Sequence, residues 1–358
     1  MEVKTRAKIK PAIVRGSHGL GSRNLRFCFW EKCRIRKIDL TRMRRAFFIV
    51  GPTATGKSEL AADVAREMRA EIVSADAFQI YRGLDLLAAK PDASTLAKVP
   101  HHLIGTMPLH EEMNAEKYRR AASRAIEEIQ SRGRRAIVVG GSGLYIKALI
   151  YGLAPVPEFD PKLRERLNAT SLDELRSRLI ELDSQAAGKI DMKNRRRVVR
   201  ALEICLLTGK PASAQAKEWT VAARADRGEP VSTIPATGVF VFRDREGLYA
   251  RVNRRVERMF EDGVIEEVRA AGEVSTTASQ MIGFREIRQL LNGEMSITQC
   301  VAAIQQATRR YAKRQLTWFR RQTNFSPLNL SLLTHNEAEI LLRMLSERRR
   351  FSGVRAKG

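Results

Sequence analysis

The sequence is poor in acidic residues, in paired cysteines and in long apolar runs. It has 40 aspartates and glutamates against 64 lysines and arginines, a net charge of +24. This excess of positive charge favours a polyanionic partner, and nucleic acid is the leading candidate. The alternative is a basic surface without a specialised role. The four cysteines form no C-x-x-C pair and have no histidines at metal spacing, which indicates reduced thiols in a cytosolic protein. No apolar run approaches the ~18 residues of a membrane span, so we expect no membrane partner.

The chain divides by composition. Its 358 residues suffice for two lobes. Residues 1–45 hold 14 lysines and arginines against three acids, and we expect a disordered basic extension. It could be a targeting segment, an RNA-binding arm, or sequence upstream of a misassigned start. Strand signals vanish between residues 154 and 233, which predicts an inserted helical lobe within a core of residues 46–153 and 234–325. Residues 326–358 read as a C-terminal tail.

The segment Gly51–Ser58 reads G-x-x-x-x-G-K-S. It follows the apolar run 46–50 and precedes a helical pattern over 59–68, the strand–loop–helix context of a P-loop. In such a loop backbone amides turn toward phosphate oxygens, Lys57 supplies a positive charge, and Ser58 offers a hydroxyl to Mg²⁺. The residues that we expect around the phosphates are Gly51, Thr53, Ala54, Thr55, Gly56, Lys57 and Ser58.

Two further predicted strands end in polar residues. Residues 70–76 form an apolar run that ends at Asp76, and the run from 134 to 140 is followed by Ser142. The carboxyl ends of parallel strands meet at one edge of a sheet, where ligands bind. We therefore predict an α/β fold, a P-loop NTPase-like parallel sheet flanked by helices, with Asp76 and Ser142 near the loop. Asp76 could be a general base or a lone metal-side aspartate, and Ser142 could be only a helix cap.

Motifs elsewhere narrow the chemistry. No apolar strand ends in the Asp-Glu pair of ATPases and helicases, which leaves a P-loop kinase as the first hypothesis. Four arginines at i, i+3, i+4 and i+7 (Arg251, Arg254, Arg255, Arg258) share one helix face, where like charges repel unless phosphates answer them. The last firm helix, 298–321, has an apolar stripe and a second face rich in arginine.

The exact residues of the motifs and the order in which they occur identify a protein family more specifically than their spacing does. They are Gly51–Ser58, Asp76-Ala-Phe-Gln-Ile-Tyr-Arg-Gly-Leu-Asp85, Ala89-Lys-Pro91, Pro100-His-His-Leu-Ile104, Val139-Gly-Gly-Ser-Gly-Leu-Tyr145, Arg196-Arg-Val-Val-Arg-Ala-Leu-Glu203, Thr208-Gly-Lys-Pro211, Ile282-Gly-Phe-Arg-Glu286 and Ala312-Lys-Arg-Gln-Leu-Thr-Trp-Phe-Arg320. From about residue 46 to 325 the chain resembles the tRNA dimethylallyltransferases, the tRNA isopentenyltransferase family.

The resemblance implies transfer of a dimethylallyl group from dimethylallyl diphosphate to the exocyclic N6 amine of the adenosine immediately 3′ of the tRNA anticodon. It implies Mg²⁺ as cofactor, Asp76 as general base, and Ser142 where the family usually has threonine. Arg251 or Arg255 matches the arginine that assists the diphosphate, and Arg251 is preferred. Contacts to the anticodon stem-loop are implied for Asp76, Ala77, Phe78, Gln79, Asn194, Arg195, Arg196, Arg197, Val198, Gln280, Gly283, Phe284, Arg285, Lys313 and Arg314.

The chain also differs from the family pattern. Ala77 replaces the serine after the base, Leu87 begins a Leu-Ala-Ala-Lys-Pro segment that usually starts with Gly-Thr, and Phe284 replaces a tyrosine. The eukaryotic zinc-finger extension has no counterpart, so we expect a bacterial-type, cytoplasmic and monomeric member. The rival functions are an isopentenyltransferase of free adenine nucleotides, a P-loop kinase of small molecules and a non-enzymatic RNA-binding protein. The basic charge favours RNA.

Overall fold

The structure is a computed structural model, and it describes residues 46–153, 157, 160–214, 237–322 and 325–347. The predicted basic extension at residues 1–45 lies outside the described residues. Within the described residues, no helix combines the length and the apolar composition that crossing a bilayer requires.

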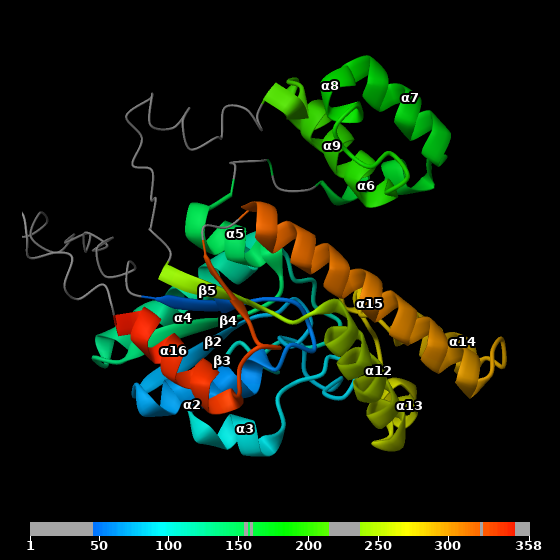
Figure 1. Cartoon of the computed structure of the whole chain (residues 1–358). Helices are drawn as coiled ribbons and strands as arrows, with labels where there is room; N and C mark the ends of the chain where they lie inside the picture. Colours follow the sequence, from blue (N-terminus) through cyan, green and yellow to red (C-terminus); the bar gives the residue numbers. More distant parts are fainter. Residues whose placement is uncertain (1–45, 154–156, 158–159, 215–236, 323–324, 348–358) are drawn as a thin grey trace, which may run out of the picture. The chain divides into compact units, whose positions relative to one another are not determined.

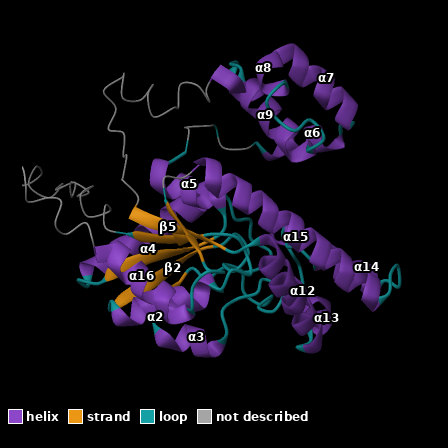
Figure 2. Ribbon diagram, viewed as in Figure 1, coloured by secondary structure: helices purple, strands orange, loops and turns teal. Residues whose placement is uncertain are grey.

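A six-stranded parallel sheet lies at the centre of the core (Figures 1 and 2), in the order β3-β2-β4-β1-β5-β6. Its strands are β1 (Phe47–Val50), β2 (Ala70–Ala75), β3 (His101–His102), β4 (Arg135–Gly140), β5 (Thr237–Phe242) and β6 (Ser326–Asn329). The predicted parallel α/β fold is confirmed. Because β1 lies between β4 and β5, the loop that follows it emerges in the middle of the carboxyl edge.

Both faces of the sheet are buried, as parallel sheets require. Phe48 and Val50 of β1 join one apolar cluster with the helices α4 (Ala115–Ser131) and α5 (Gly143–Tyr151). Phe47 and Ile49, the alternate residues, join a second cluster with α2 (Lys57–Glu67). Side chains along a strand alternate between its faces, so this four-residue apolar run is fixed between two helical layers.

The C-terminal residues differ from the tail that we predicted at 326–358. Strand β6 pairs with β5, and helix α16 (His335–Glu347) packs on α2. Leu342 is fully buried there, and Nε2 of His335 lies 3.0 Å from Oδ2 of Asp63. The prediction missed both elements because Ser326–Asn329 carries little apolar character and becomes a strand only through its neighbour β5.

Four helices pack against one another beyond β5. They are α12 (Arg245–Glu261), α13 (Val264–Ala270), α14 (Phe284–Leu291) and the long α15 (Ile297–Gln322). Their shared core includes Val256, Val268, Ile287 and Ile304, all less than 5 % exposed. This packing fixes two basic helices, α12 and α15, against each other.

The described residues between α5 and β5 form helices joined by short loops and turns. It contains α6 (Pro161–Ala169), α7 (Leu172–Leu182), α8 (Ser184–Ala187) and α9 (Arg195–Thr208). These helices have an apolar cluster of their own, with Leu175, Leu179 and Val198 fully buried. Glu203, also fully buried, accepts hydrogen bonds from Arg164 and Arg200. The lobe boundaries at 154 and 233 stay predictions, since the residues around them lie outside the described ranges.

Candidate functional site

The phosphate loop joins β1 to α2 through a backbone that only glycine allows at two points. A Cβ on Gly51 would lie 2.1 Å from the carbonyl oxygen of Val241 on the neighbouring strand. Gly56 has φ +91° and stands immediately before the first residue of α2. The left-handed turn at Gly56 directs the following amides of the helix N-terminus into the concave side of the loop. The predicted strand, loop and helix are therefore present in their predicted order.

Four cations surround this loop and each donates a hydrogen bond to it. The bonds run from Lys57 Nζ to the Pro52 carbonyl (3.2 Å), from Arg243 Nε to the Thr55 carbonyl (2.9 Å), from Arg251 Nε to the Ala54 carbonyl (2.8 Å) and from Arg255 Nη1 to Thr53 Oγ1 (3.0 Å). The predicted arginine stripe on α12 divides here: Arg251 and Arg255 reach the loop, whereas Arg254 and Arg258 are exposed to solvent.

The crowding of these cations is visible in their pKa values. Burial lowers the pKa of Lys57 to about 8, with Asp76 opposing the shift and Arg255 adding to it. Burial also lowers the pKa of Arg255 and of Arg243, and Arg251 lowers both further. Desolvated like charges are unfavourable unless an anion joins them. The loop is therefore an anion site whose electrostatics suit a multiply charged phosphate group.

Asp76 follows β2 and faces this cluster. Its Oδ1 accepts hydrogen bonds from the amides of Phe78 (3.0 Å) and Gln79 (3.4 Å), which fixes the turn after the strand. Ser142 stands at the start of α5 without capping it; its Oγ instead accepts a hydrogen bond from the amide of Ala77 at 2.8 Å. The side chain of Ser142 thus holds the backbone beside Asp76, which disfavours its reading as a mere cap.

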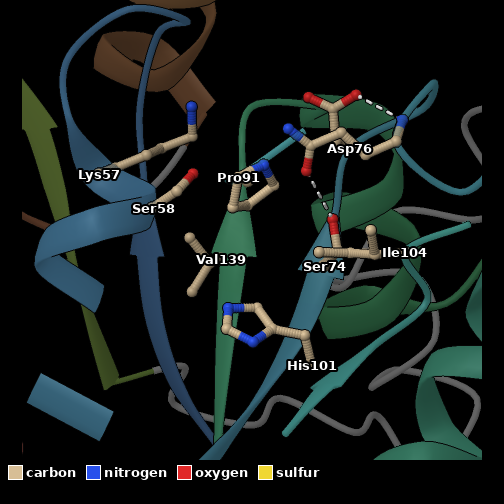
Figure 3. Close-up of a pocket in the computed structure, with 10 residues that line it drawn as sticks. Lys57, Ser58, Ser74, Asp76, Pro91, His101, Ile104 and Val139 are labelled. Atoms are coloured by element: carbon tan, nitrogen blue, oxygen red, sulfur yellow. Dashed lines mark hydrogen bonds between the residues drawn. The ribbon is translucent and has the colours of Figure 1, made fainter. Parts of the chain in front are cut away.

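Two cavities meet at Asp76. The first, about 320 Å³, is lined by Lys57, Ser58, Ser74, Asp76, Gln79, Pro91, His101, Ile104, Val139 and Gly140. Figure 3 shows Lys57 and Ser58 on one wall of it and Asp76 above Ser74 on the opposite wall. The second, about 540 Å³, is lined by Thr53, Asp76, Phe78, Leu87, Ala88, Arg255, Val256, Met259, Met281, Ile282, Ile304, Thr308 and Tyr311. A carboxylate thus separates a small polar space from a larger, mostly apolar one.

The first cavity also offers oxygen ligands to a cation. The hydroxyl of Ser58, the carboxylate of Asp76 and the hydroxyl of Ser74 line it together. Among the described residues no cluster of three or more histidine, cysteine, aspartate or glutamate side chains could hold a metal. Mg²⁺ suits such a sparse set, because it keeps several waters and takes other ligands from substrate phosphates. The residues present fit the predicted magnesium ion.

The residues that we predicted to contact tRNA differ widely in their exposure to solvent. Gln280, Arg285, Lys313 and Arg314 are exposed on the core, and Arg285 is held only by Glu286 at 3.5 Å. Gly283 and Phe284, by contrast, are buried, and the Phe284 ring packs among apolar side chains below Arg288. A base cannot stack on a ring that is 7 % exposed, so the structure argues against Phe284 as a direct contact.

The predicted contacts of α9 are divided in the same way. Asn194 caps the helix by accepting a hydrogen bond from the Arg197 amide. The Arg195 guanidinium donates hydrogen bonds to three backbone carbonyls at the C-terminal end of α6, those of Leu167, Asn168 and Thr170. Val198 is fully buried in the lobe core and is out of reach of a ligand. The sequence pattern could not separate these roles, because one helix turn presents core, cap and solvent positions together. Arg196 and Arg197 remain exposed.

The positions that differ from the family pattern are locally satisfied. The amide of Ala77 is bonded to Ser142, so the segment after the base is fixed without a serine side chain there. The amides of Leu86 and Leu87 donate to the Glu267 carboxylate at 2.8 and 2.9 Å. Leu87 itself is 5 % exposed and forms part of the apolar wall of the larger cavity.

Sequence reasoning missed three residues of the site: Arg243, Tyr311 and Gln315. Arg243 follows directly on the predicted strand β5, and its position at a carboxyl strand end was the available signal. Tyr311 falls on the predicted apolar stripe of α15, and it lines the larger cavity. Gln315 is a polar residue that is 5 % exposed, which its place in a polar stretch of sequence did not indicate.

Fold and site together define a P-loop-like phosphate-binding α/β protein with a carboxylate beside the phosphate loop. A model of the IPP transferase family matches residues 79–322. The chain is 43% identical over 290 residues to tRNA dimethylallyltransferase 1 of Citrifermentans bemidjiense, covering 80% of this chain and 92% of that one. It is 44% identical over 281 residues to the tRNA dimethylallyltransferase of Geobacter sulfurreducens, covering 76% and 88%. This protein belongs to the IPP transferase family.

Solved structures give the same result. The tRNA isopentenylpyrophosphate transferase of Bacillus halodurans superposes with a TM-score of 0.60 at 31% identity, over 84% of this chain and 94% of that one. The corresponding enzyme of Staphylococcus epidermidis has a TM-score of 0.60 at 30% identity, over 85% and 99%. The resemblance stated from the motifs is confirmed.

Proposed function

We propose that this protein transfers a dimethylallyl group from dimethylallyl diphosphate to the exocyclic N6 amine of the adenosine immediately 3′ of the anticodon in tRNA. The observation that carries the proposal is the place of Asp76, which lines both the cavity at Lys57 and Ser58 and the apolar cavity at Thr53 and Arg255. A proton acceptor at that junction suits a reaction in which an amine meets an allylic carbon beside a departing diphosphate.

The cationic loop supports departure of the diphosphate. The bond between the allylic carbon and the bridging oxygen breaks, and both of its electrons leave with the diphosphate. Lys57, Arg251 and Arg255 converge on the loop that would hold this anion, and they stabilise the charge that develops on it. Mg²⁺, held through Ser58 and the cavity oxygens of Asp76 and Ser74, would supply further positive charge to the diphosphate.

Asp76 supports the nucleophilic half of the reaction. The N6 nitrogen forms a bond to the allylic carbon and loses one proton, which the Asp76 carboxylate accepts. Oδ1 of Asp76 is held by the Phe78 and Gln79 amides, so the carboxylate has a fixed direction. The adenosine must leave its stack in the anticodon loop to reach a group between two cavities.

The larger cavity supports protection of the allylic group from water. Leu87, Val256 and Met281 are each 5 % exposed or less, and they form a wall opposite the polar groups of the loop. An allylic diphosphate that loses its leaving group reacts with any nucleophile present, and apolar side chains beside the allylic group reduce the competition of water with the amine.

The tRNA is the substrate that the charge pattern favours over a free nucleotide. Exposed Arg196 and Arg197 lie on α9, and exposed Lys313 and Arg314 lie on α15. Phosphate contacts of this kind bind a nucleic-acid backbone and position the reactive base. We propose a cytoplasmic enzyme that acts as a monomer.

A labelling experiment tests the function. Labelled dimethylallyl diphosphate and Mg²⁺ are incubated with the protein and an anticodon stem-loop, the same stem-loop with guanosine at the target position, or AMP. We expect label on the adenosine stem-loop alone, because guanosine lacks the N6 amine. Label on AMP alone would contradict the tRNA assignment, and ATP turnover without prenyl transfer would favour the kinase.

The two arginines of α12 are expected to differ in their effect on diphosphate. Arg255 is partly buried and bonded to Thr53, whereas Arg251 is exposed at the rim of the loop. A charged hydrogen bond contributes ~1.5–3 kcal/mol, and solvent weakens it at the rim. We therefore expect Arg255→Gln to weaken inhibition by inorganic diphosphate ~10–100-fold and Arg251→Gln to weaken it less.

Inhibition constants for inorganic diphosphate would measure this difference, with Arg258→Gln, an exposed arginine of the same helix, as the control. A larger loss in Arg251→Gln than in Arg255→Gln would return the assignment to Arg251, the residue preferred from sequence.

A further inference from the structure

Gln315 joins the phosphate loop to the end of strand β4. It projects from α15 and is 5 % exposed. Its Oε1 accepts a hydrogen bond from the Thr53 amide at 3.0 Å, and its Nε2 donates one to the Gly141 carbonyl at 2.9 Å. Both ends of one buried amide are thus occupied by backbone groups of two different segments, Gly51–Ser58 and the turn before α5.

The fit at this contact is close. A Cβ on Gly141 would lie 2.3 Å from Nε2 of Gln315 and 2.9 Å from the carbonyl oxygen of Gly51. Only glycine at position 141 therefore allows the amide to reach between the loop and the strand end. Loss of the Gln315 side chain would leave both backbone groups buried without a partner, which is unfavourable.

The hydrogen bonds of Gln315 also link it to the backbone beside Asp76, the proposed general base. The Gly141 carbonyl that Gln315 binds belongs to the peptide group that joins Gly141 to Ser142. Ser142 in turn accepts the bond from the Ala77 amide, next to Asp76. Three hydrogen bonds and one peptide group therefore connect Thr53 in the phosphate loop, through Gln315, Gly141 and Ser142, to Ala77, the residue after Asp76.

We propose that Gln315 is a positioning residue that sets the separation between the diphosphate loop and Asp76. The proposal rests on the prenyl transfer proposed above. Gln315 itself lines neither cavity, so it acts through Thr53 and through Gly141 with its neighbour Ser142. The reaction needs the leaving group and the proton acceptor on the two reacting partners at once, and a displacement of 1 Å can lower a rate ~10²-fold.

Two substitutions test this role. Gln315→Glu keeps the acceptor for the Thr53 amide but places a carboxylate oxygen against the Gly141 carbonyl, and Gln315→Leu removes both bonds at similar volume. We expect kcat to fall ~10-fold in Gln315→Glu and ~100-fold in Gln315→Leu, with KM for dimethylallyl diphosphate and the Kd for the stem-loop within about threefold of wild type. Gln306→Leu, an exposed glutamine on the same helix, is the control and should leave kcat unchanged.

A double substitution separates positioning from stability. In an Asp76→Asn background, where no carboxylate remains to be aligned, Gln315→Glu should cost less than about threefold, since residues that act as a unit are not additive. The proposal would be overturned if Gln315→Glu lowered kcat by the same factor in the wild-type and Asp76→Asn backgrounds. It would also be overturned if the fall in kcat only matched the fall in the fraction of folded protein measured by thermal melts. Unchanged turnover in both Gln315 variants would overturn it as well. If the wild-type protein transfers no prenyl group, the proposed function fails instead, and that result is distinguishable.

Discussion

Replacing Asp76 with asparagine is expected to lower kcat for dimethylallyl transfer ~10²–10⁴-fold, the usual contribution of a general base. The asparagine carbonyl can still accept the hydrogen bonds that Oδ1 of Asp76 accepts from Phe78 and Gln79, so the turn should persist. The stem-loop should therefore bind with unchanged Kd while single-turnover transfer becomes slow. Rapid-quench measurement of labelled stem-loop gives the rate of the transfer itself.

Asp92→Asn is a matched control, because Asp92 also accepts a bond from a nearby amide, that of Thr95 at 2.7 Å, but lines neither cavity. The alternative role of Asp76 as a magnesium ligand makes a different prediction. If high Mg²⁺ concentrations restored the rate of Asp76→Asn, the residue would serve the metal; a rate equal to wild type would remove Asp76 from the mechanism altogether.

Replacing Lys57 with methionine is the second large effect. Lys57 is a partly buried cation at the first turn of α2. Its ammonium group now donates to the Pro52 carbonyl, and we expect it to bind diphosphate oxygens when the donor is present. Removing one preorganised group of this kind typically costs ~10²–10³ in rate. We expect kcat/KM for dimethylallyl diphosphate to fall by this factor in Lys57→Met, with stem-loop affinity preserved. Lys147→Met, an exposed lysine on α5, should behave as wild type.

The pKa of Lys57 adds a dependence on pH. Burial lowers this pKa to about 8 in the free protein, so the ammonium group loses its proton as the pH rises through that value. Because kcat/KM reports the free enzyme, it should decline above pH 8 in the wild type, and the decline should vanish in Lys57→Arg, whose guanidinium stays charged. The free energy of unfolding should rise between pH 8 and 10.5, because the unfolded state then binds more protons than the native state. A kcat/KM that is flat to pH 10 in the wild type would contradict this role for Lys57.

The sequence predicted those parts of the fold whose signals are local. Phe47–Val50 is a continuous apolar run before a glycine loop, so this strand lies within one residue of its predicted bounds, 46–50. The phosphate loop was recognisable because its geometry depends on glycine at fixed spacing, as Gly51 and Gly56 demonstrate. Local chemistry was enough for these elements.

The remaining features depend on partners distant in sequence. Gln315 lies 262 residues from Thr53, and no pattern within α15 marks a glutamine whose amide is buried against another segment. The burial of Val198 and Phe284 likewise follows from packing that a motif does not encode. Val198 and Phe284 belong to the family motifs at residues 196–203 and 282–286. The motifs give the residue types, but only the structure separates the residues that are buried in the fold from those that face solvent.

Both edges of the sheet are poor templates for another chain. The outer strand β3 consists of two residues, His101 and His102, and at the opposite edge β6 carries Pro327, which has no amide hydrogen to donate. Exposed strand edges that are long and regular invite main-chain pairing between copies, whereas short strands and proline block it. Copies of the protein that meet at high concentration would thus have little main-chain surface on which to aggregate through their sheets.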